Sequence, residues 1–499
     1  MMQQSGLFKF FAVLVSVLLV VMLALWFAPV KSVVLWTDAL VYVLIITIAG
    51  FFTYVRSKEH LITPWRHVVR RPLAVVSLVV LSAYVLVGLL DSVHFRQALE
   101  QSRDNKEIHY SVEVESLLDI LANPIRKNIE KSYSAPLASH LYTKDTVEQP
   151  DGTTVREYPR LKHGGAHLQD PATERIPDIN KRTVMAVVEA LVVWILVMVI
   201  FVAVFSYRNQ VKVMDCMRKV FEGRTVVPWR SVFITMGVLI LIATLVKELG
   251  VHYHLLGTDK VGNDVLYLSI KSIRTGLVIG TLTTLIMLPF AILLGIMAGH
   301  FRGWVDDVIQ YIYTTLNSIP GVLLIAAAIL SVDLYIANNP ELFETVVERA
   351  DLRLLFLCLI LGITSWTGLC RLLRGETLKL REMDYIQAAT AFGVKDMKII
   401  SRHILPNVMH IVLIVIVLDF SGLVLAEAVL SYVGVGVDPS MISWGNMING
   451  ARLEMAREPV VWWSLVAAFW FMFVLVLAAN IFSDAVRDAF DPRVGRTHN

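Results

Sequence analysis

Long runs of apolar residues alternate with polar loops along the chain, and ten of these runs approach the length of a membrane span. A helix of about 20 residues crosses the ~30 Å hydrocarbon layer of a bilayer. The runs are continuously apolar, without a two-residue alternation, which favours helices over barrel strands. The pattern predicts an all-α integral membrane protein with about ten transmembrane helices. The predicted spans are Phe11–Ala28, Ala39–Val55, Leu73–Leu90, Val184–Ser206, Val232–Val246, Gly276–Ile296, Val308–Leu330, Leu355–Leu369, Val408–Leu430 and Val460–Ser483.

The first run follows Lys9 and has the general form of a secretory signal. It is long for a signal core, however, and the residues before Pro29 offer no small-residue cleavage site. We therefore expect an uncleaved first span. The run Leu355–Leu369 is the shortest, and we expect that helix to extend at its ends.

Basic residues gather in the loops that follow the second, fourth and eighth runs, and cytoplasmic loops are those with an excess of Lys and Arg. These three loops fall on one side if the ten spans alternate. The opposite loops are poorer, with Lys31 alone after the first run. The charge pattern predicts that both termini lie in the cytoplasm. The basic residues are Arg56, Lys58, Arg66, Arg70 and Arg71; Arg208, Lys212, Arg218, Lys219, Arg224 and Arg230; and Arg371, Arg374, Lys379, Arg381, Lys395, Lys398 and Arg402.

One long polar region, Ser92–Arg182, lies outside the membrane in this topology. It contains stretches rich in Gly, Pro and Asp around Pro150 and Pro171, and a helix-like piece at Val112–Ile129. A small folded domain and a partly ordered loop both fit. Its few aromatic residues argue against a large core of its own.

Composition agrees with a membrane protein and offers no sign of catalysis. The chain is 56% hydrophobic and 17% charged, and its net charge of +3 gives no reason to expect nucleic acid as a partner. Three cysteines lack zinc-type spacing and are expected to be packing residues. No phosphate loop, zinc-protease or nucleophile-elbow motif occurs. We expect no catalytic residue, no metal site and no ATP bound by this chain.

The stretch from Tyr385 to Asn407 is Gly-centred, helix-forming and partly basic, and it lies between two very apolar segments. Ala388 and Ala389 would keep a helix surface flat enough to enter a groove on a partner. Gly393 would let the chain turn between two short helices. Pro406 is expected to end the segment and start the next span. Such an element between spans is suited to docking a soluble protein.

This stretch resembles the cytoplasmic coupling loop of ABC importer permeases. Ala388, Ala389, Gly393, Leu405 and Pro406 stand at the spacing of that pattern. Two positions depart from it, because Gln and His replace the usual Glu and Ile. The residues that the resemblance assigns to ATPase coupling are Tyr385, Gln387, Ala388, Ala389, Gly393, Lys395, Leu405 and Pro406.

A second stretch resembles the signature after the first core span in the C-type subunit of the dipeptide, oligopeptide and nickel branch. It contains Gly257, Thr258, Asp259, Gly262 and Asp264. The family usually has Arg where this chain has Asn between the last two. On physical grounds, Thr258 and Asp259 are expected to cap a short helix on the outer membrane surface. Two further matches lie at 426–445 and 480–493.

These matches cover roughly Val232–Arg496 and imply that the last six spans form the core of a type I ABC importer permease. The implied divisions are 1–91 with three spans, 92–182 as a periplasmic region, 183–229 with the fourth span, and 230–499 as the core, including a coupling loop at 380–406. The resemblance implies a bacterial inner membrane location. It also implies a second permease subunit, two ABC ATPase subunits that hold ATP and Mg, a periplasmic solute-binding protein, and a peptide-like cargo. The first four spans have no counterpart in the usual six-span subunit.

Ionisable residues inside spans need a partner or water, because a carboxylate facing lipid costs about 2.5–3.5 kcal/mol. Asp419 lies mid-span, Glu427 nearer the outer end, and Glu189 early in the fourth span. A helix–helix hydrogen bond is the more common role for such residues. Lining of the translocation path is the alternative for Asp419 and Glu427.

Two other classes of protein remain open. An ion-gradient-driven secondary transporter would use Asp419 and Glu189 as proton sites. A membrane sensor or scaffold would use Ser92–Arg182 as its ligand domain. Copurification of an ATPase separates the first from an ABC importer, and a transport measurement separates the second.

Overall fold

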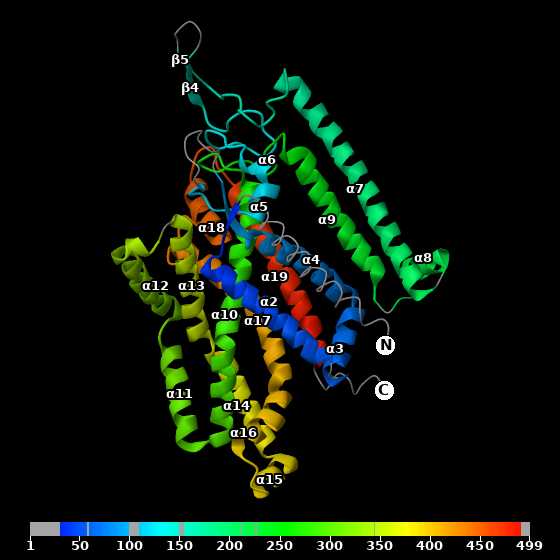
Figure 1. Ribbon diagram of the computed structural model, residues 1–499. Helices are drawn as coiled ribbons and strands as arrows, with labels where there is room; N and C mark the ends of the chain where they lie inside the picture. The colour runs from blue at the N-terminus through cyan, green and yellow to red at the C-terminus, as the bar shows by residue number, and fades with distance from the viewer. Residues whose placement is uncertain are drawn as a thin grey trace.

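Helices dominate the computed structural model (Figure 1). Within the described residues, eight helices are long and apolar enough to cross a membrane, and a shorter apolar helix covers Trp36–Gly50. The predicted all-α membrane fold is confirmed. The predicted first span, Phe11–Ala28, lies outside the described residues. The structure describes residues 30–56, 59–98, 109–148, 154–210, 212–223, 225, 227–343 and 345–490.

The helices fall into two groups along the chain, which we call the extension, before α9, and the core, from α9 onward. The extension contains α2 (Trp36–Arg56), α3 (Glu59–Arg70), α4 (Pro72–Asp91), α5 (Leu117–Leu121), α6 (Asn123–Arg126), α7 (Pro171–Asn209) and α8 (Val213–Phe221). The core contains α9 (Trp229–Gly250), α10 (Val265–Phe301), α11 (Gly303–Ser318), α12 (Gly321–Asn338), α13 (Val346–Ser365), α14 (Thr367–Arg381), α15 (Asp384–Ala391), α16 (Asp396–Ile399), α17 (Leu405–Val433), α18 (Trp444–Glu454) and α19 (Trp463–Phe490).

The described strands are few, short and confined to the extension. The antiparallel sheet β1-β2-β3 joins the residues before α2 to those after α4, and so holds the start of α2 beside the end of α4. A separate antiparallel hairpin, β4–β5, projects at the top of Figure 1. The strands are β1 (Val30–Val33), β2 (His94–Gln97), β3 (Glu115–Ser116), β4 (Asp145–Glu148) and β5 (Thr154–Glu157).

Helix α10 occupies the centre of the bundle and packs against α4, α13, α14, α17 and α19. Small residues make this close packing possible. A Cβ added at Gly295 would lie 2.8 Å from the Cys370 carbonyl oxygen, and one at Gly299 would lie 2.6 Å from the Thr377 Cβ. Glycine at these positions allows the backbones of α10 and α14 to approach each other.

Two predicted spans each cross a boundary between two helices of the structure. The apolar run Val308–Leu330 is not one helix, because the chain breaks between α11 and α12 at Ile319 and Pro320. Proline has no N–H to donate and disfavours a helical conformation in the residue before it. The run Leu355–Leu369 extends at both ends as predicted, into α13 and α14.

The predicted helix at Val112–Ile129 is wrong. This stretch forms β3 followed by two short helices, α5 and α6. A capping box between Ser116 and Asp119 starts α5, and Pro124 in the first turn of α6 prevents the two from joining. Apolar residues here pack on the core: Ile125, for example, contacts a cluster that contains Leu266. The helix with the predicted fourth span, α7, begins at Pro171.

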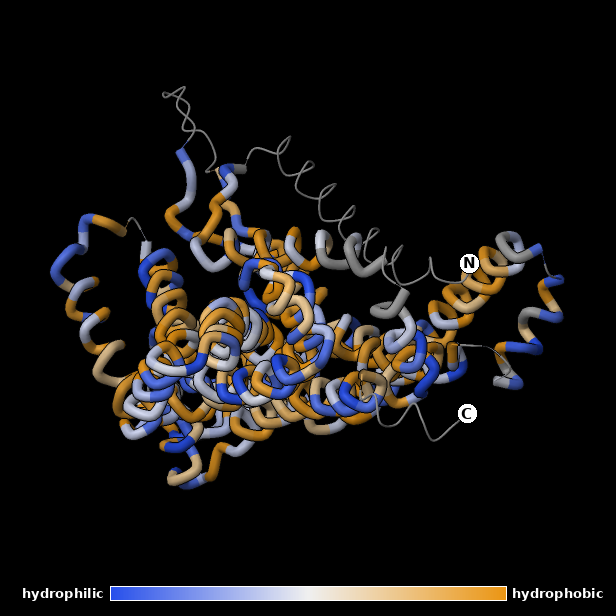
Figure 2. Tube along the Cα trace, turned by 90° about the horizontal axis from the view of Figure 1, so that it is seen from below, coloured by the Kyte–Doolittle hydropathy of each residue, from blue (hydrophilic) through white to orange (hydrophobic). Residues whose placement is uncertain are grey.

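Much of the α7 surface is apolar and exposed. Val188, Leu196 and Val204 are each more than half exposed, although α7 packs along α9. Figure 2 shows hydrophobic residues along most of the helices when the molecule is seen from below. In a bilayer such side chains face lipid, so membrane lipid is the natural partner of this surface.

Candidate functional site

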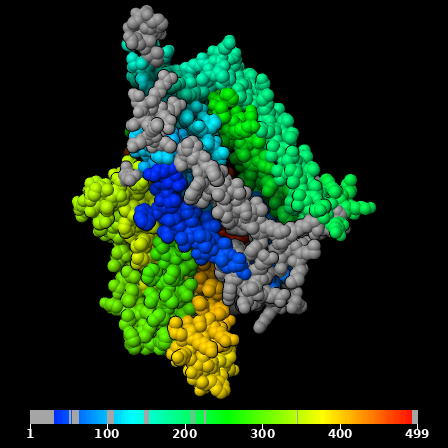
Figure 3. Space-filling view, viewed as in Figure 1, coloured from blue at the N-terminus to red at the C-terminus, as the bar shows by residue number. Residues whose placement is uncertain are grey.

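The loop predicted to dock a soluble partner projects from one end of the molecule (Figures 1 and 3). It consists of α15 and α16 with a turn between them, and we call residues 380–406 the coupling segment. The strands β4 and β5 lie at the opposite end of the bundle (Figure 1). A partner bound to the coupling segment would therefore lie across the membrane from the polar part of the extension.

Gly393 ends α15 in a backbone conformation that glycine adopts without strain. Its φ is 75°, in the left-handed region. The Gly393 N–H donates to the Thr390 carbonyl at 3.0 Å, and the Val394 N–H donates to the Ala389 carbonyl at 3.1 Å. These two bonds form the Schellman motif that ends many helices. The prediction that Gly393 turns the chain between two short helices is confirmed.

The two faces of α15 differ in exposure. Ile386 is buried, and the half-buried Ala389 packs against the same core cluster. Tyr385, Gln387 and Ala388 are exposed. Of the two alanines, only Ala388 lies on the outward face, whereas Ala389 packs against the bundle.

Two large apolar side chains beside the turn are exposed, and the sequence analysis singled out neither. Phe392 is 87% exposed and Met397 is 73% exposed, with the exposed Lys395 between them in sequence. Grouped apolar side chains on a surface indicate an interaction site. Their position on either side of Gly393, next to the charged Lys395 and Asp396, is the signal that could have identified them.

The segment after α16 differs from the prediction for Pro406. One helix runs without a break over Asp396–Val433, so Pro406 does not end the segment. A π-helical turn at Ile400–Ile404 joins α16 to α17, and such a turn absorbs an irregularity without ending the helix. Leu405 is the first residue of α17 and Pro406 lies in its first turn, so the predicted start of the span is confirmed.

Ion pairs fix the helices that lead into the coupling segment. Arg374 on α14 contacts both carboxylate oxygens of Asp306 on α11, at 2.6 and 2.7 Å. Arg302, between α10 and α11, pairs with Glu382 at the end of α14. Because bidentate pairs restrict orientation as well as distance, α14 enters the segment from a defined position.

The second predicted site lies directly before α10, at the end of the core opposite the coupling segment. Asp264 is the N-cap of α10, and its Oδ1 accepts hydrogen bonds from the N–H groups of Leu266 at 2.8 Å and Tyr267 at 3.3 Å. Neither Thr258 nor Asp259 caps a helix. The prediction for these two residues is wrong, because the helix begins only after Asp264.

Thr258 binds the extension instead. Its Oγ1 accepts from the Ser134 N–H at 2.6 Å and donates to the Ser132 carbonyl at 2.8 Å. Asp259 organises its own loop, where its Oδ1 accepts from the backbone N–H of Asn263 at 2.8 Å. The loop 257–264 therefore binds the extension through Thr258 and stabilises its own turn through Asp259.

Two glycines of this loop are required by the extension. Gly257 has a φ of 71°, and a Cβ there would lie 2.4 Å from the Ser134 carbonyl oxygen. Gly262 has a φ of 83°, and a Cβ there would lie 1.8 Å from the Glu130 carbonyl oxygen. Both a left-handed conformation and contact with neighbouring backbone exclude a larger residue.

A buried imidazole joins this loop to the extension. His254 Nδ1 lies 2.7 Å from Asp264, and its Nε2 lies 3.3 Å from Glu130. Burial alone would lower the pKa of His254, but hydrogen bonds to Asp264 and Glu130 outweigh it and raise the pKa to about 9. Burial tends to raise the pKa of Glu130, but bonds from His254 and from the backbone N–H groups of residues 162–164 lower it to about 2.

The attachment should weaken in alkaline solution. A raised pKa means that the charged His254 stabilises the fold fully below its ordinary value of 6.5, and that this contribution is lost as the pH rises through about 9. This pKa shift corresponds to a contribution of His254 to the free energy of unfolding on the order of 3 kcal/mol. We expect the thermal unfolding temperature of the purified chain to fall between these pH values, and to fall much less in His254→Gln. An equal fall in both proteins would contradict the assignment.

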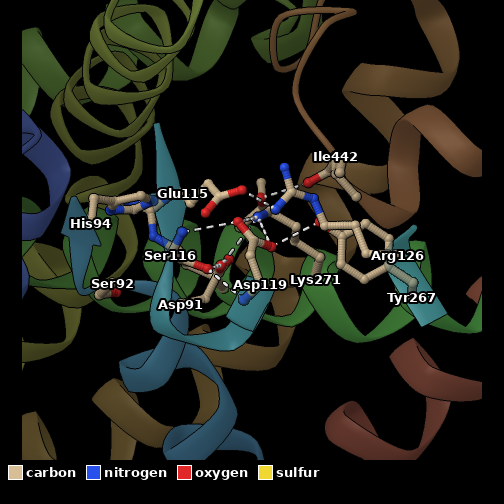
Figure 4. Close-up of polar contacts among 12 residues, drawn as sticks. Asp91, Ser92, His94, Glu115, Ser116, Asp119, Arg126, Tyr267, Lys271 and Ile442 are labelled. Atoms are coloured by element: carbon tan, nitrogen blue, oxygen red, sulfur yellow. Dashed lines mark hydrogen bonds and ion pairs between the residues drawn. The ribbon is translucent and has the colours of Figure 1, made fainter. Parts of the chain in front are cut away.

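A second polar cluster connects the extension to α10 (Figure 4). Lys271 Nζ lies 2.6 Å from the Asp119 Oδ2 and 3.5 Å from Asp91. The Tyr267 hydroxyl donates to Asp119 at 2.8 Å, and the Ser116 hydroxyl donates to Asp91 at 2.6 Å. The carboxylates come from α4 and α5, and the cation comes from α10.

A third cluster lies deeper and surrounds Arg274 of α10. Its Nη2 lies 2.6 Å from Asp38 Oδ1 and 2.8 Å from the Thr37 hydroxyl, both on α2. Asp351 on α13 lies 3.6 Å away. His94 on β2 contacts the other oxygen of Asp38 at 2.7 Å. Extension and core therefore share buried charges as well as apolar packing.

The carboxylates inside the spans have different surroundings. Glu427 is buried and accepts a hydrogen bond from Ser431 of the same helix at 2.8 Å. Glu189 on α7 pairs with Lys247 on α9 at 2.5 Å, which is a helix–helix contact. Asp419 is half-buried, and within the described part of the chain no hydrogen bond or ion pair reaches it. A path-lining role for Asp419 and Glu427 stays a prediction.

The described residues contain no group of three or more potential metal ligands. Cys358 and Cys370 are free and buried, and both lie in apolar clusters, as expected for packing residues.

Comparison with known proteins supports the resemblance to ABC importer permeases. The family model for the binding-protein-dependent transport system inner membrane component matches residues 291–496, which include the coupling segment. The chain is 32% identical to the glutathione transport system permease protein GsiD of Pectobacterium atrosepticum, over 48% of this chain and 73% of the relative. It is 30% identical to the oligopeptide transport system permease protein OppC of Haemophilus influenzae, over 48% and 71%. Identity to the dipeptide transport system permease protein DppC of Bacillus subtilis is 28%, over 49% and 70%. The chain belongs to the family of inner membrane components of binding-protein-dependent transport systems and is a permease subunit of an ABC importer.

Proposed function

We propose that this chain is the C-type permease subunit of a peptide-importing ABC system in the bacterial inner membrane, with both termini in the cytoplasm. It pairs with a second permease subunit, binds two ABC ATPase subunits inside, and receives cargo from a periplasmic solute-binding protein outside. The relatives named as glutathione, dipeptide and oligopeptide transport permeases support peptides or peptide-like compounds as cargo.

The observation that carries this proposal is the projecting coupling segment. Its outward face combines a small residue, Ala388, with two large apolar side chains, Phe392 and Met397. A small residue permits close approach of a groove, and the apolar side chains supply area that is buried on binding. The inward face, at Ile386, ties the segment to the bundle, so a force on the segment reaches the spans.

The mechanism follows from differential binding. ATP and Mg on the partner subunits favour closure of the ATPase pair, and the coupling segment carries this closure to the spans as rigid-body rocking. This chain lowers no chemical barrier itself. Its role is to have two conformations whose balance ATP inside and the loaded binding protein outside can shift.

The proposal is tested by crosslinking in a complex coexpressed with the proteins encoded by neighbouring genes. The native cysteines are replaced by alanine, and single cysteines are introduced by Ala388→Cys and Phe392→Cys. We expect both to crosslink to a copurified ATPase subunit, because both positions are exposed on the coupling segment. The readout is the mass of the crosslinked product.

Val112→Cys serves as the matched control, because residue 112 is 75% exposed but lies in the external region. It should react with a membrane-impermeant maleimide added outside intact spheroplasts and should form no ATPase crosslink. An assembly without an ATPase, or crosslinks only from position 112, would refute the proposal and the predicted orientation.

A further inference from the structure

His300 lies in the last turn of α10, where the inner end of that helix meets the coupling segment. The residue is only 7% exposed. Its Nε2 lies 3.0 Å from the Oδ1 of Asp396, the first residue of α16. Its carbonyl oxygen accepts a hydrogen bond from Arg381 Nη1, at the end of α14, at 2.7 Å. One residue of α10 thus contacts the coupling segment on both sides of α15.

The helix that carries His300 is firmly packed at this end. The close approach at Gly295 and Gly299 brings α10 against α14, and Arg374 of α14 is held by Asp306 just beyond α10. The inner ends of α10 and α14 therefore behave as one packed unit. The contact from His300 to Asp396 extends this unit to α16, to which the chain and apolar contacts such as Ile399 also join it.

Packing alone does not account for a histidine here. The His300 Nδ1 is buried, and none of the described residues forms a hydrogen bond with it. A buried polar atom without a partner costs free energy, and a phenylalanine would fill similar space without that cost. The benefit that offsets the cost is the directed contact of Nε2 with Asp396.

We propose that His300 is a positioning residue for energy coupling, which ties α16 to α10 so that nucleotide-driven movement enters the bundle through α10 as well as through α17. This inference rests on the proposed function, since it requires ATPase subunits on the coupling segment. It adds a polar route: without the tie, α16 would act on the spans through its continuous helix with α17 and through apolar contacts such as Ile399.

The outer end of α10 connects this route to the extension. Helix α10 has 37 residues and is about 55 Å long at 1.5 Å per residue. Near its outer end, Lys271 and Arg274 bind carboxylates of the extension. Movement that enters at His300 therefore reaches the extension, and a ligand bound to the extension would by linkage act back on the coupling segment.

The test uses the reconstituted complex in proteoliposomes and a mixture of radiolabelled di- to pentapeptides as the transport probe. The variants are Asp396→Ala, which removes the acceptor, and His300→Phe, which keeps the volume and removes the donor. We expect both to retain ATPase subunits and to hydrolyse ATP, whereas peptide taken up per ATP hydrolysed falls by about tenfold. His300→Gln, whose amide can donate to Asp396, should restore most of this ratio.

Asp307→Ala is the matched control. Asp307 is exposed near the start of α11, outside the coupling segment, and no hydrogen bond or ion pair involves it in the described structure. The uptake per ATP of this variant should equal that of the wild type. Because the Asp396 side chain is 57% exposed, Asp396→Ala should fold even if a substitution at His300 does not.

The outcomes separate the two proposals. A wild-type complex without ATPase subunits or without peptide uptake sinks the proposed function, and this inference with it. A working wild type with normal uptake per ATP in Asp396→Ala and His300→Phe overturns only the inference. Loss of ATPase subunits from these variants also overturns it, because His300 would then serve docking and not the transmission of movement.

Discussion

Arg274→Met should destabilise the chain by about 3–5 kcal/mol, which is the largest stability effect that we expect from a single substitution here. The Arg274 side chain is 7% exposed, and it lies between the carboxylates of Asp38 and Asp351, which are 0% and 1% exposed. Removal of the guanidinium leaves two buried negative charges without their main partner. The effect is measured as the shift in thermal or denaturant unfolding of the detergent-solubilised chain.

Two controls separate lost charge pairing from lost packing. Arg71→Met removes a pair with Asp488 in which both side chains are about half exposed, so its effect should stay below about 1 kcal/mol. Adding Asp38→Asn and Asp351→Asn to Arg274→Met should recover much of the stability, because the buried charges then disappear together. A wild-type midpoint in Arg274→Met alone would show that the extension is not held to the core by this cluster.

Gly393→Val should strongly reduce energy coupling while leaving the protein in the membrane. A β-branched residue at a φ of 75° costs about 1–3 kcal/mol in the observed conformation. No atom of the described residues lies within 4 Å of a Cβ at this position, so the penalty is conformational and confined to the turn. A change of about 1.4 kcal/mol alters an equilibrium constant tenfold. We therefore expect peptide uptake to fall by about tenfold or more.

The matched substitution is Gly393→Asn, since asparagine tolerates the left-handed conformation better than other side chains. It should retain most of the uptake at equal expression. Membrane content is followed by immunoblot and ATPase retention by copurification, so that lost uptake is distinguished from lost protein. Full uptake in Gly393→Val would remove the coupling segment from the mechanism.

The parts of the fold that depend on local signals could be predicted from the sequence. Continuous apolar runs identified the spans, and the turn at Gly393 followed from a glycine between two short helix-forming stretches. The break at Pro320 was also present in the sequence as a proline, but the apolar run around it concealed the boundary. The π-helical turn before Leu405 has no local signal of that kind, because it depends on how α16 packs under the bundle.

The contacts between extension and core could not be predicted, because they join residues far apart in the chain. Arg274 and Asp38 are separated by 236 positions, and Lys271 and Asp119 by 152. In the sequence, each of these residues is only a charged residue near or outside the end of a predicted span, with nothing to indicate its partner. Only the fold brings them together, and with them the reason why Gly262 cannot be larger.

These buried ion pairs limit how the protein could be rebuilt. A chimaera that grafts this extension onto a foreign six-span permease would need a histidine at the position of His254 and cations at those of Lys271 and Arg274. Without these partners, the extension would place carboxylates that lack a counter-charge in a buried interface. The two halves of this polypeptide are in that sense matched parts, and a change at one side of the seam calls for a complementary change at the other.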